Sequence, residues 1–381
     1  MRNIYIIYFL INIHGWFACN HVSSNSPDGD IQQDIDANAD QDEALDANDI
    51  PDEDNINSHW ELVEPVGDMW EPRAGFAVVV HAGKIWILGG MVMRNGYPAV
   101  TDDVWASSDG VTWELIKPAD NSAWYPRANF AAVSMNGRIW VMGGNWDNSG
   151  TPEYESDVWV SVDGVHWERI MESHWPATNT AWGDRKGLAA VVFNEKIWVM
   201  GGADTTSLAD VWFSTDGAIW NRADATWGSR AHHCALVYHD KLWVMGGQKG
   251  YTTNAWNDVW FSADGIVWEL SGTLPQVVYG HACAVSSNGM WVLGGQGGDA
   301  VRNRVWFSAD GTAWESIQYE TVFTERWYHG AAVFAGSLWV FGGAYQEQMG
   351  LSLRNDVWRL TLPLVHESRS MPCLMMTSKN Y

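Results

Sequence analysis

Residues Lys84 to Gly90 read Lys-Ile-Trp-Ile-Leu-Gly-Gly, and related stretches recur along this chain of 381 residues. Each stretch ends in a glycine pair, and the pairs stand at Gly89-Gly90, Gly143-Gly144, Gly201-Gly202, Gly246-Gly247, Gly294-Gly295 and Gly342-Gly343. A repeat of roughly 50 residues is typical of a propeller blade. Because one blade cannot bury its apolar faces alone, six copies predict six blades stacked around an axis.

Each copy resolves into four short strands, a to d in chain order. Strand a is a run of small and β-branched residues such as 76–80, and strand b ends at the glycine pair. Strand c carries Asp-Val-Trp, as at 103–105, and an adjacent Asp-Gly then predicts a tight turn into strand d. The predicted fold class is therefore all-β, a six-bladed β-propeller of four-stranded blades.

The last copy is incomplete, because no Asp-Gly and no further Trp follow Trp358-Arg359-Leu360. The missing piece stands at the other end of the repeats, where Trp60-Glu61-Leu62 matches Trp113-Glu114-Leu115. We therefore expect an N-terminal strand to pair as the outer strand of the last blade and to close the ring without an open seam.

The glycine pairs, the aromatic residue in strand c and the Trp in strand d make the chain from Trp60 to Leu364 resemble a Kelch-repeat β-propeller. The family usually has Tyr in strand c where this chain has Trp. The segment from Ser107 to Trp113 is similar to the Asp-box of sialidase propellers, but Asp109 and Gly110 are adjacent, which favours a hairpin turn. The propeller also resembles the central domain of galactose oxidase, but the copper ligands of that enzyme have no match here.

The first nineteen residues have the pattern of a secretory leader. Arg2 precedes an apolar run from Ile4 to Ile13, which is too short to span a bilayer. Ala18-Cys19 resembles the lipobox of bacterial lipoproteins, and that resemblance implies lipidation at Cys19. We expect an extracytoplasmic protein, either an outer-membrane or cell-surface lipoprotein of a bacterium or a secreted protein.

The predicted domains are the leader (1–19), a tether (20–57), the propeller (58–364) and a C-terminal tail (365–381). The tether carries twelve acidic residues and no basic ones between Ser26 and Asn55, so it cannot fold around a core. Its acidic run does not match an EF-hand, because Ala39 and Leu45 stand where Gly and Glu are required. The chain has a net charge of −24, which opposes binding to nucleic acid or to an anionic membrane.

Cys234 and Cys283 lie in strand a of adjacent blades, one position out of phase. Because alternate residues of a strand point to opposite faces, we expect these two side chains to face apart and to form no disulfide.

Tryptophan use separates scaffold from surface, because eighteen of the 27 tryptophans recur at fixed positions in strands b, c and d. Apart from Trp16 in the leader, the others stand between strands b and c or between strand d and the next strand a: Trp70, Trp124, Trp146, Trp175, Trp182, Trp227, Trp256 and Trp327. These two sets of loops emerge at one end of a propeller, which is the predicted binding face.

A Trp-x-x-Arg pattern repeats in the same loops. The arginines stand sixteen residues before the glycine pair, at Arg73, Arg127, Arg185, Arg230 and Arg326, with Val278 breaking the series. Four of them follow Trp70, Trp124, Trp182 and Trp227, and the fifth follows Phe323. Guanidinium groups and indoles around the channel mouth would suit a carboxylate, a sugar or an apolar side chain. The alternative is a structural role, with each Arg bonded to loop carbonyls.

The predicted ligand-binding residues are therefore Trp70, Arg73, Trp124, Arg127, Trp146, Trp182, Arg185, Trp227, Arg230, Trp256, Arg326 and Trp327. His233, His281 and His329 share one repeat position, and the pattern leaves open either a three-histidine metal site or core packing. We predict no catalytic residue, no metal and no cofactor. The sequence favours a monomeric, non-catalytic propeller that binds a protein or a glycan, and the alternative is a carbohydrate-active enzyme similar to Kelch-type sialic-acid epimerases.

Overall fold

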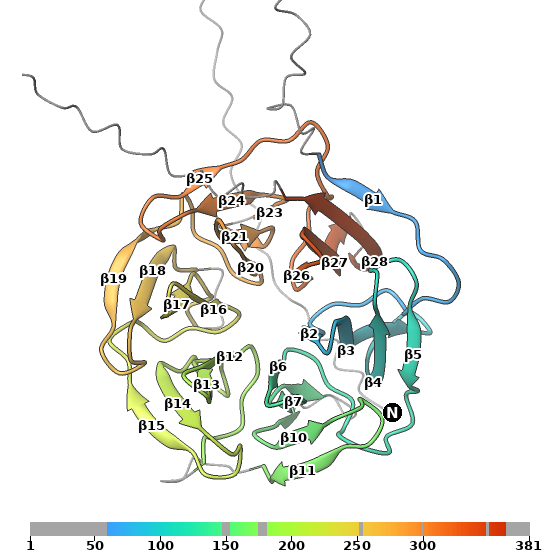
Figure 1. Cartoon of the computed structure of the whole chain (residues 1–381), viewed down its shortest axis with the longest axis horizontal. Helices are drawn as coiled ribbons and strands as arrows, with labels where there is room; N and C mark the ends of the chain where they lie inside the picture. Colours follow the sequence, from blue (N-terminus) through green and yellow to red (C-terminus); the bar gives the residue numbers. More distant parts are fainter. Residues whose placement is uncertain are drawn as a thin grey trace, which may run out of the picture. The chain divides into compact units, whose positions relative to one another are not determined.

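The computed structural model describes residues 59–146, 153–173, 181–250, 254–298, 300–347 and 350–362. Their secondary structure consists of strands β1 to β28. Six four-stranded antiparallel sheets stand radially around a central axis (Figure 1), which confirms the predicted six-bladed β-propeller. Among the described residues there is no helix long and apolar enough to span a membrane.

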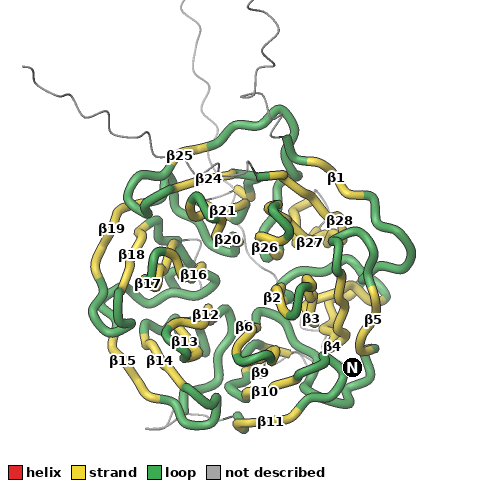
Figure 2. Tube along the Cα trace, viewed as in Figure 1, coloured by secondary structure: helices red, strands yellow, loops and turns green. Residues whose placement is uncertain are grey.

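The four strands of each blade follow one another from the axis outward (Figure 2). Blade 1 consists of β2 (Ala77–His81), β3 (Lys84–Arg94), β4 (Tyr97–Ser107) and β5 (Glu114–Lys117). Blade 2 consists of β6 (Ala131–Met135), β7 (Arg138–Met142), β10 (Val158–Ser161) and β11 (Glu168–Met171). Blade 3 consists of β12 (Ala189–Phe193), β13 (Lys196–Met200), β14 (Asp210–Ser214) and β15 (Asn221–Asp224).

The second half of the ring follows the same plan. Blade 4 consists of β16 (Cys234–Tyr238), β17 (Lys241–Met245), β18 (Asp258–Ser262) and β19 (Glu269–Thr273). Blade 5 consists of β20 (Ala282–Ser286), β21 (Gly289–Leu293), β24 (Val305–Ser308) and β25 (Glu315–Ser316). Blade 6 consists of β26 (Gly330–Phe334), β27 (Ser337–Glu347), β28 (Gly350–Thr361) and β1 (Glu61–Val63). Two small hairpins, β8 (Asn145–Trp146) with β9 (Glu153–Tyr154) and β22 (Gln296–Gly297) with β23 (Ala300–Val301), lie in the b–c loops of blades 2 and 5.

The two ends of the ring carry different connections. Because neighbouring strands run antiparallel, all a–b and c–d turns lie at one end, which we call the turn face. The b–c and d–a connections lie at the other end, the loop face, where every sequence-predicted binding residue belongs.

The predicted closure of the ring is confirmed. Strand β1 pairs antiparallel with β28, with Leu62 opposite Trp358. Arg359 also donates to Glu61 across this pair, at 2.7 Å. The last blade therefore obtains its outer strand from the beginning of the propeller sequence, and the ring has no open seam.

Two of the recurring sequence signals meet between blades. A side chain at Gly110, in the Asp-Gly turn of blade 1, would place its Cβ 2.5 Å from the ring of Trp339 in blade 6. Gly164 in blade 2 receives Trp86 of blade 1 in the same way. The Asp-Gly motif is thus a hairpin turn, as predicted, and its glycine also leaves room for the strand-b tryptophan of the preceding blade.

Cys234 and Cys283 form a disulfide between the innermost strands of blades 4 and 5, with their Cα atoms 6.1 Å apart. The prediction of no disulfide was wrong, because it compared the two side chains on a single sheet. In a ring, one blade presents its forward face and the next blade its backward face to the same interface. Positions of opposite phase on adjacent blades therefore point toward each other.

A ring of backbone hydrogen bonds connects the six blades at the loop-face end of the innermost strands. One residue from each blade donates its N–H to the carbonyl of the residue from the preceding blade, at 2.7–2.9 Å. All six have positive φ, between +52° and +62°. The members are Gly75, Asn129, Gly187, His232, Gly280 and Tyr328. Three glycines alternate with three larger residues, and the rings of His232 and Tyr328 meet at 4.9 Å between centroids.

Candidate functional site

Each Trp-x-x-Arg arginine in the loop face forms a buried bidentate ion pair with the Asp of the strand-c Asp-Val-Trp motif. Arg73 donates from Nη1 and Nη2 to the two carboxylate oxygens of Asp103, both at 2.8 Å, and from Nη1 to the Gly89 carbonyl at 2.9 Å. Trp105 Nε1 donates to the same carboxylate at 2.8 Å. We call this arrangement the Arg–Asp lock, and the five locks are Arg73–Asp103, Arg127–Asp157, Arg185–Asp210, Arg230–Asp258 and Arg326–Asp356.

The locks are electrostatically satisfied inside the protein. Burial by itself would raise the pKa of Asp103, but the hydrogen bonds and charge of Arg73 hold that pKa below its ordinary value. Asp210 and Asp356 have lowered pKa values through the same balance with Arg185 and Arg326. These carboxylates are therefore ionised at neutral pH and occupy the guanidinium groups fully.

The aromatic member of each Trp-x-x-Arg pattern packs beneath its arginine. Trp70 lies 5.8 Å from the Arg73 guanidinium, and Trp182 lies 5.6 Å from that of Arg185. The pattern residues of all five locked blades are buried, at 0–2% exposure: Trp70, Arg73, Trp124, Arg127, Trp182, Arg185, Trp227, Arg230, Phe323 and Arg326. The prediction that these arginines and tryptophans line the channel mouth for a ligand is therefore corrected. Their burial and their ion pairs fit the alternative, in which they have a structural role.

Three predicted residues do reach the surface of the loop face: Trp146, Trp256 and Trp327 are half-buried. Trp146 stacks on Tyr125, with 5.7 Å between ring centroids and planes 14° apart, and donates from Nε1 to Glu155 at 3.0 Å. Trp256 lies 4.9 Å from the Lys249 ammonium and donates to the Ser229 carbonyl. Trp175 lies outside the described residues.

Sequence reasoning missed two exposed tyrosines on this face. Tyr125 is 56% exposed, and Tyr97, in the β3–β4 hairpin, is 75% exposed. Tyr125 directly follows the buried Trp124, so alternation in an extended segment was the available signal. This signal does not predict exposure reliably, because side chains in loops do not alternate between two faces as they do in a strand.

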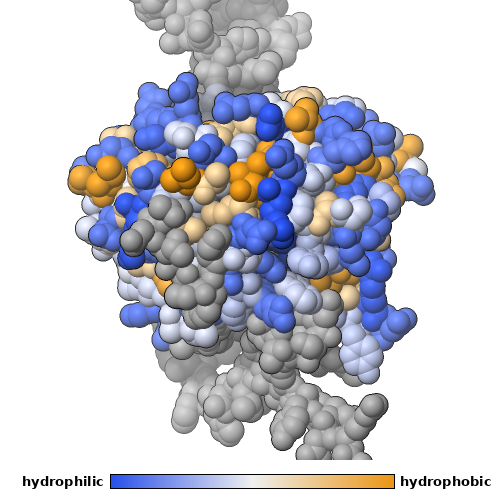
Figure 3. All heavy atoms as spheres, turned by 90° about the horizontal axis from the view of Figure 1, so that it is seen from below, coloured by the Kyte–Doolittle hydropathy of each residue, from blue (hydrophilic) through white to orange (hydrophobic). Residues whose placement is uncertain are grey.

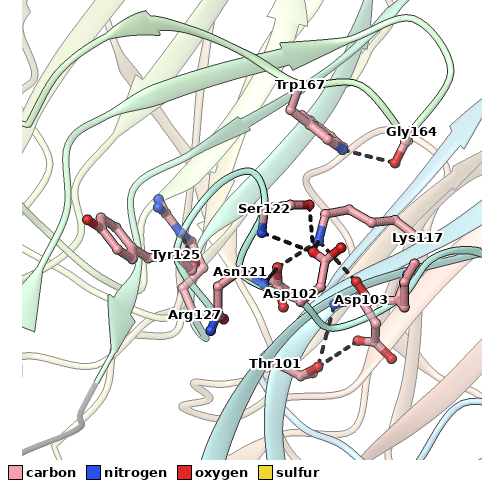
Figure 4. A network of polar contacts seen from close by, with 12 residues as sticks. Thr101, Asp102, Asp103, Lys117, Asn121, Ser122, Tyr125, Arg127, Gly164 and Trp167 are labelled. Carbon is pink, nitrogen blue, oxygen red and sulfur yellow. Dashed lines mark hydrogen bonds and ion pairs between the residues drawn. The ribbon is translucent and has the colours of Figure 1, made fainter.

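A buried ion pair in blade 1 holds the start of the loop that carries Tyr125. Lys117 donates from Nζ to Asp102 at 2.7 Å and to Asp120 at 2.8 Å, and the backbone N–H of Asn121 donates to Asp102 at 3.1 Å (Figure 4). The side chains of Lys117 and Asp102 are 2% and 1% exposed. The hydrogen bond from Lys117 lowers the pKa of Asp120. The start of the loop that carries Tyr125 is therefore held to blade 1 by a buried ion pair and a backbone hydrogen bond.

The loop face also contains a groove of about 510 Å³ over blade 3. Its charged lining includes Asp184, Asp204, Arg222 and Asp224. A smaller cavity of about 120 Å³ lies in the channel against the ring of backbone hydrogen bonds. The groove is the larger of these two hollows.

The three registered histidines lie between blades. A Cβ on Gly201 would lie 2.9 Å from the ring of His233, which comes from the following blade. Burial lowers the pKa values of His233, His281 and His329 well below their ordinary range. Among the residues that the structure describes, no group of three or more His, Cys, Asp or Glu side chains is arranged to hold a metal ion. These three histidines are therefore buried core residues.

Elsewhere on the surface, exposed aliphatic residues lie both in turns and on strands, where Leu62 of β1 and Leu270 of β19 are examples. Val162, Ile219 and Val267 lie in or beside the Asp-Gly turns of the turn face and are 60–65% exposed. The side view in Figure 3 shows apolar groups interrupted by polar ones around the rim. Scattered exposed aliphatic residues of this kind are ordinary on protein surfaces.

Comparisons with known proteins agree with the fold. A family model described as the KLHDC2/KLHL20/DRC7 Kelch-repeats domain matches residues 40–247. Kelch repeat protein M-T8 of myxoma virus (strain Lausanne) is 29% identical over 184 residues, which are 46% of this chain and 31% of that protein. Beta-scruin of Limulus polyphemus is 30% identical over 36% of this chain and 14% of that protein. The F-box/kelch-repeat protein At1g67480 of Arabidopsis thaliana is 22% identical, and the match covers 40% of each chain. The chain thus spans less than half the length of these relatives.

Proposed function

This chain belongs to the KLHDC2/KLHL20/DRC7 Kelch-repeat family, and from that premise we propose that its loop face binds a protein partner. The observation that carries the proposal is the Tyr125–Trp146 stack, in which Tyr125 is 56% exposed and Trp146 is half-buried on the loop face. Tyr and Trp supply large contact areas at a small cost in side-chain entropy, and they are enriched in the centres of protein interfaces. Trp256, Trp327 and Tyr97 extend the aromatic character of the same face.

Site-specific photo-crosslinking tests this proposal. A benzophenone amino acid in place of Tyr125 should form discrete protein adducts in the native extract, whereas the same group at Thr215 in the turn face should not. Trp146→Ala should lower the adduct yield at Tyr125 by about tenfold or more, since truncating an interface anchor costs about 2 kcal/mol. The matched control Lys241→Glu, on the turn face, should leave the yield unchanged. Equal adducts from both faces would contradict the proposal.

A glycan is the second ligand class, because the exposed face of Tyr125 can stack on a sugar ring. Glycan-array binding that disappears in the Tyr125→Ala variant, without protein adducts at this position, would assign the loop face to a glycan instead.

We also propose that the protein acts outside the cytoplasm. The Cys234–Cys283 disulfide supports this location, because such bonds persist mainly in oxidising compartments. The leader and Cys19 lie outside the described residues. If Cys19 is lipidated, Cys19→Ala should move the protein from the membrane fraction to the soluble fraction. Unchanged fractionation would contradict anchoring.

A further inference from the structure

Blade 5 departs from the other five blades at both positions of the Arg–Asp lock. Val278 stands where the others have Arg, and Arg304 stands where the others have Asp. The backbone is unchanged: Gly294 N donates to the Arg304 carbonyl at 2.8 Å, as Gly246 N does to that of Asp258 at 3.2 Å. The blade therefore keeps the frame of the lock while an arginine replaces its carboxylate.

Val278 stands at the repeat position of the missing arginine. It is 0% exposed, and its backbone carbonyl accepts from Gly247 N at 2.8 Å, as the carbonyl of Arg230 accepts from Gly202 N in blade 4. An aliphatic side chain offers no charge to its neighbours. Arg304 consequently has no internal counterpart at the lock position.

Arg304 is directed to the loop face instead. Its guanidinium lies 5.5 Å from the Trp306 ring, and its Nη1 would lie 3.2 Å from a Cβ on Gly297 in the small β22–β23 hairpin. Burial and the charge of Arg302 lower the pKa of Arg304, while Glu325 partly offsets that effect. Among the described residues Arg304 makes no ion pair, and both arginines are half-buried.

We propose that Arg304, supported by Arg302, is a binding site for a carboxylate of the protein partner, so that an acidic peptide segment supplies the charge that Asp supplies in the other blades. This inference rests on the proposed binding function of the loop face and names the chemistry that one part of that face recognises. Arginine suits this task because its planar group can bind a carboxylate through two parallel hydrogen bonds. The net charge of the chain opposes acidic ligands at long range, so recognition depends on this local pair.

Fluorescence anisotropy with a labelled hexaglutamate peptide tests the site on the full chain, with hexaglutamine as the uncharged probe. We expect hexaglutamate to bind more tightly than hexaglutamine, and Arg304→Ala to weaken it about tenfold. The matched control Arg138→Ala removes an exposed arginine at the start of β7, on the turn face, and should change the affinity less than twofold. Equal binding of the two peptides, or unchanged affinity after Arg304→Ala, would overturn the proposal.

A charge-restoring variant separates binding from folding. Val278→Arg together with Arg304→Asp rebuilds the lock of the other blades, so it should fold at least as stably as the parent and lose the preference for hexaglutamate. Retention of that preference would overturn the proposal.

Asp299, which stands between β22 and β23 in the sequence and lies outside the described residues, provides a further check. Asp299→Asn should leave Tm unchanged, and destabilisation equal to that of Asp356→Asn would show that Arg304 already has an internal partner. If the parent protein does not bind hexaglutamate but still crosslinks at Tyr125, the carboxylate site alone is rejected. If the parent shows neither hexaglutamate binding nor crosslinking, the binding face is rejected as well.

Discussion

The innermost layers of blades 1 to 3 and of blades 4 to 6 occupy equivalent places in the ring but differ in chemistry. The position that packs between blades is Phe76, Phe130 and Leu188 in the first half, and His233, His281 and His329 in the second. The geometry is the same: Phe76 lies 5.8 Å from Trp70, and His233 lies 6.1 Å from Trp227. The two halves therefore pack this position in the same way, but only the histidines of the second half can bind a proton.

The second half differs in two further features. It contains the Cys234–Cys283 cross-link, and its blade 5 lacks the Arg–Asp lock. The first half depends on three complete locks and has an apolar layer at its interfaces. The same blade backbone can therefore be stabilised by different side-chain contacts in different copies of the repeat.

The largest expected effect contrasts the locked blade 2 with the unlocked blade 5. Arg127→Ala leaves the Asp157 carboxylate buried without its partner, and breaking such a pair costs about 3–5 kcal/mol of unfolding free energy. Val278→Ala removes only aliphatic atoms and should cost roughly half of that or less. Urea unfolding of both variants measures the difference. Equal costs would show that the lock is not a stabilising feature of the first half.

Removal of the cross-link should have the next largest effect and should weaken only the second half. Cys234→Ala with Cys283→Ala releases a link between residues 49 apart in sequence, which is worth about 2–4 kcal/mol. Thermal unfolding with and without reductant measures this. The parent should lose stability on reduction while the double variant should not respond, and a response of the variant would place the redox effect elsewhere.

The histidines should make stability depend on pH, with about 1.4 kcal/mol per pH unit for each group as the upper limit. Burial lowers the pKa of His281 and of His232 to about 3, against an ordinary value of 6.5. Below pH 6.5 the unfolded chain therefore binds protons that the folded chain does not, so stability falls as the pH decreases. The lock carboxylates have lowered pKa values and contribute only below about 3.8.

Replacing His233, His281 and His329 by Phe copies the first half into the second and should flatten this dependence between pH 6.5 and 4.5. Urea midpoints across that range measure the slope. A variant with the parental slope would assign the acid sensitivity to other groups.

Much of the architecture could be predicted because it depends on residues close in the repeat. The glycine pairs and Asp-Gly turns are short signals that specify hairpins, and their sixfold recurrence, with the displaced Trp60-Glu61-Leu62, predicted the blades and their closure. The binding residues were less predictable. Trp124 and Tyr125 are adjacent aromatic residues, yet one is fully buried and the other is 56% exposed.

The amino-acid sequence by itself determined the number of blades, the order of their strands and the closing partner, because local turn chemistry and periodic apolar residues act within one repeat. Only the tertiary structure decided which arginines are consumed in locks, that Cys234 meets Cys283, and that Arg304 faces the loop surface. Those outcomes depend on contacts between residues 25 to 49 positions apart or on adjacent blades. A pattern of residue types along one chain does not reveal which of two neighbouring surfaces a side chain will meet.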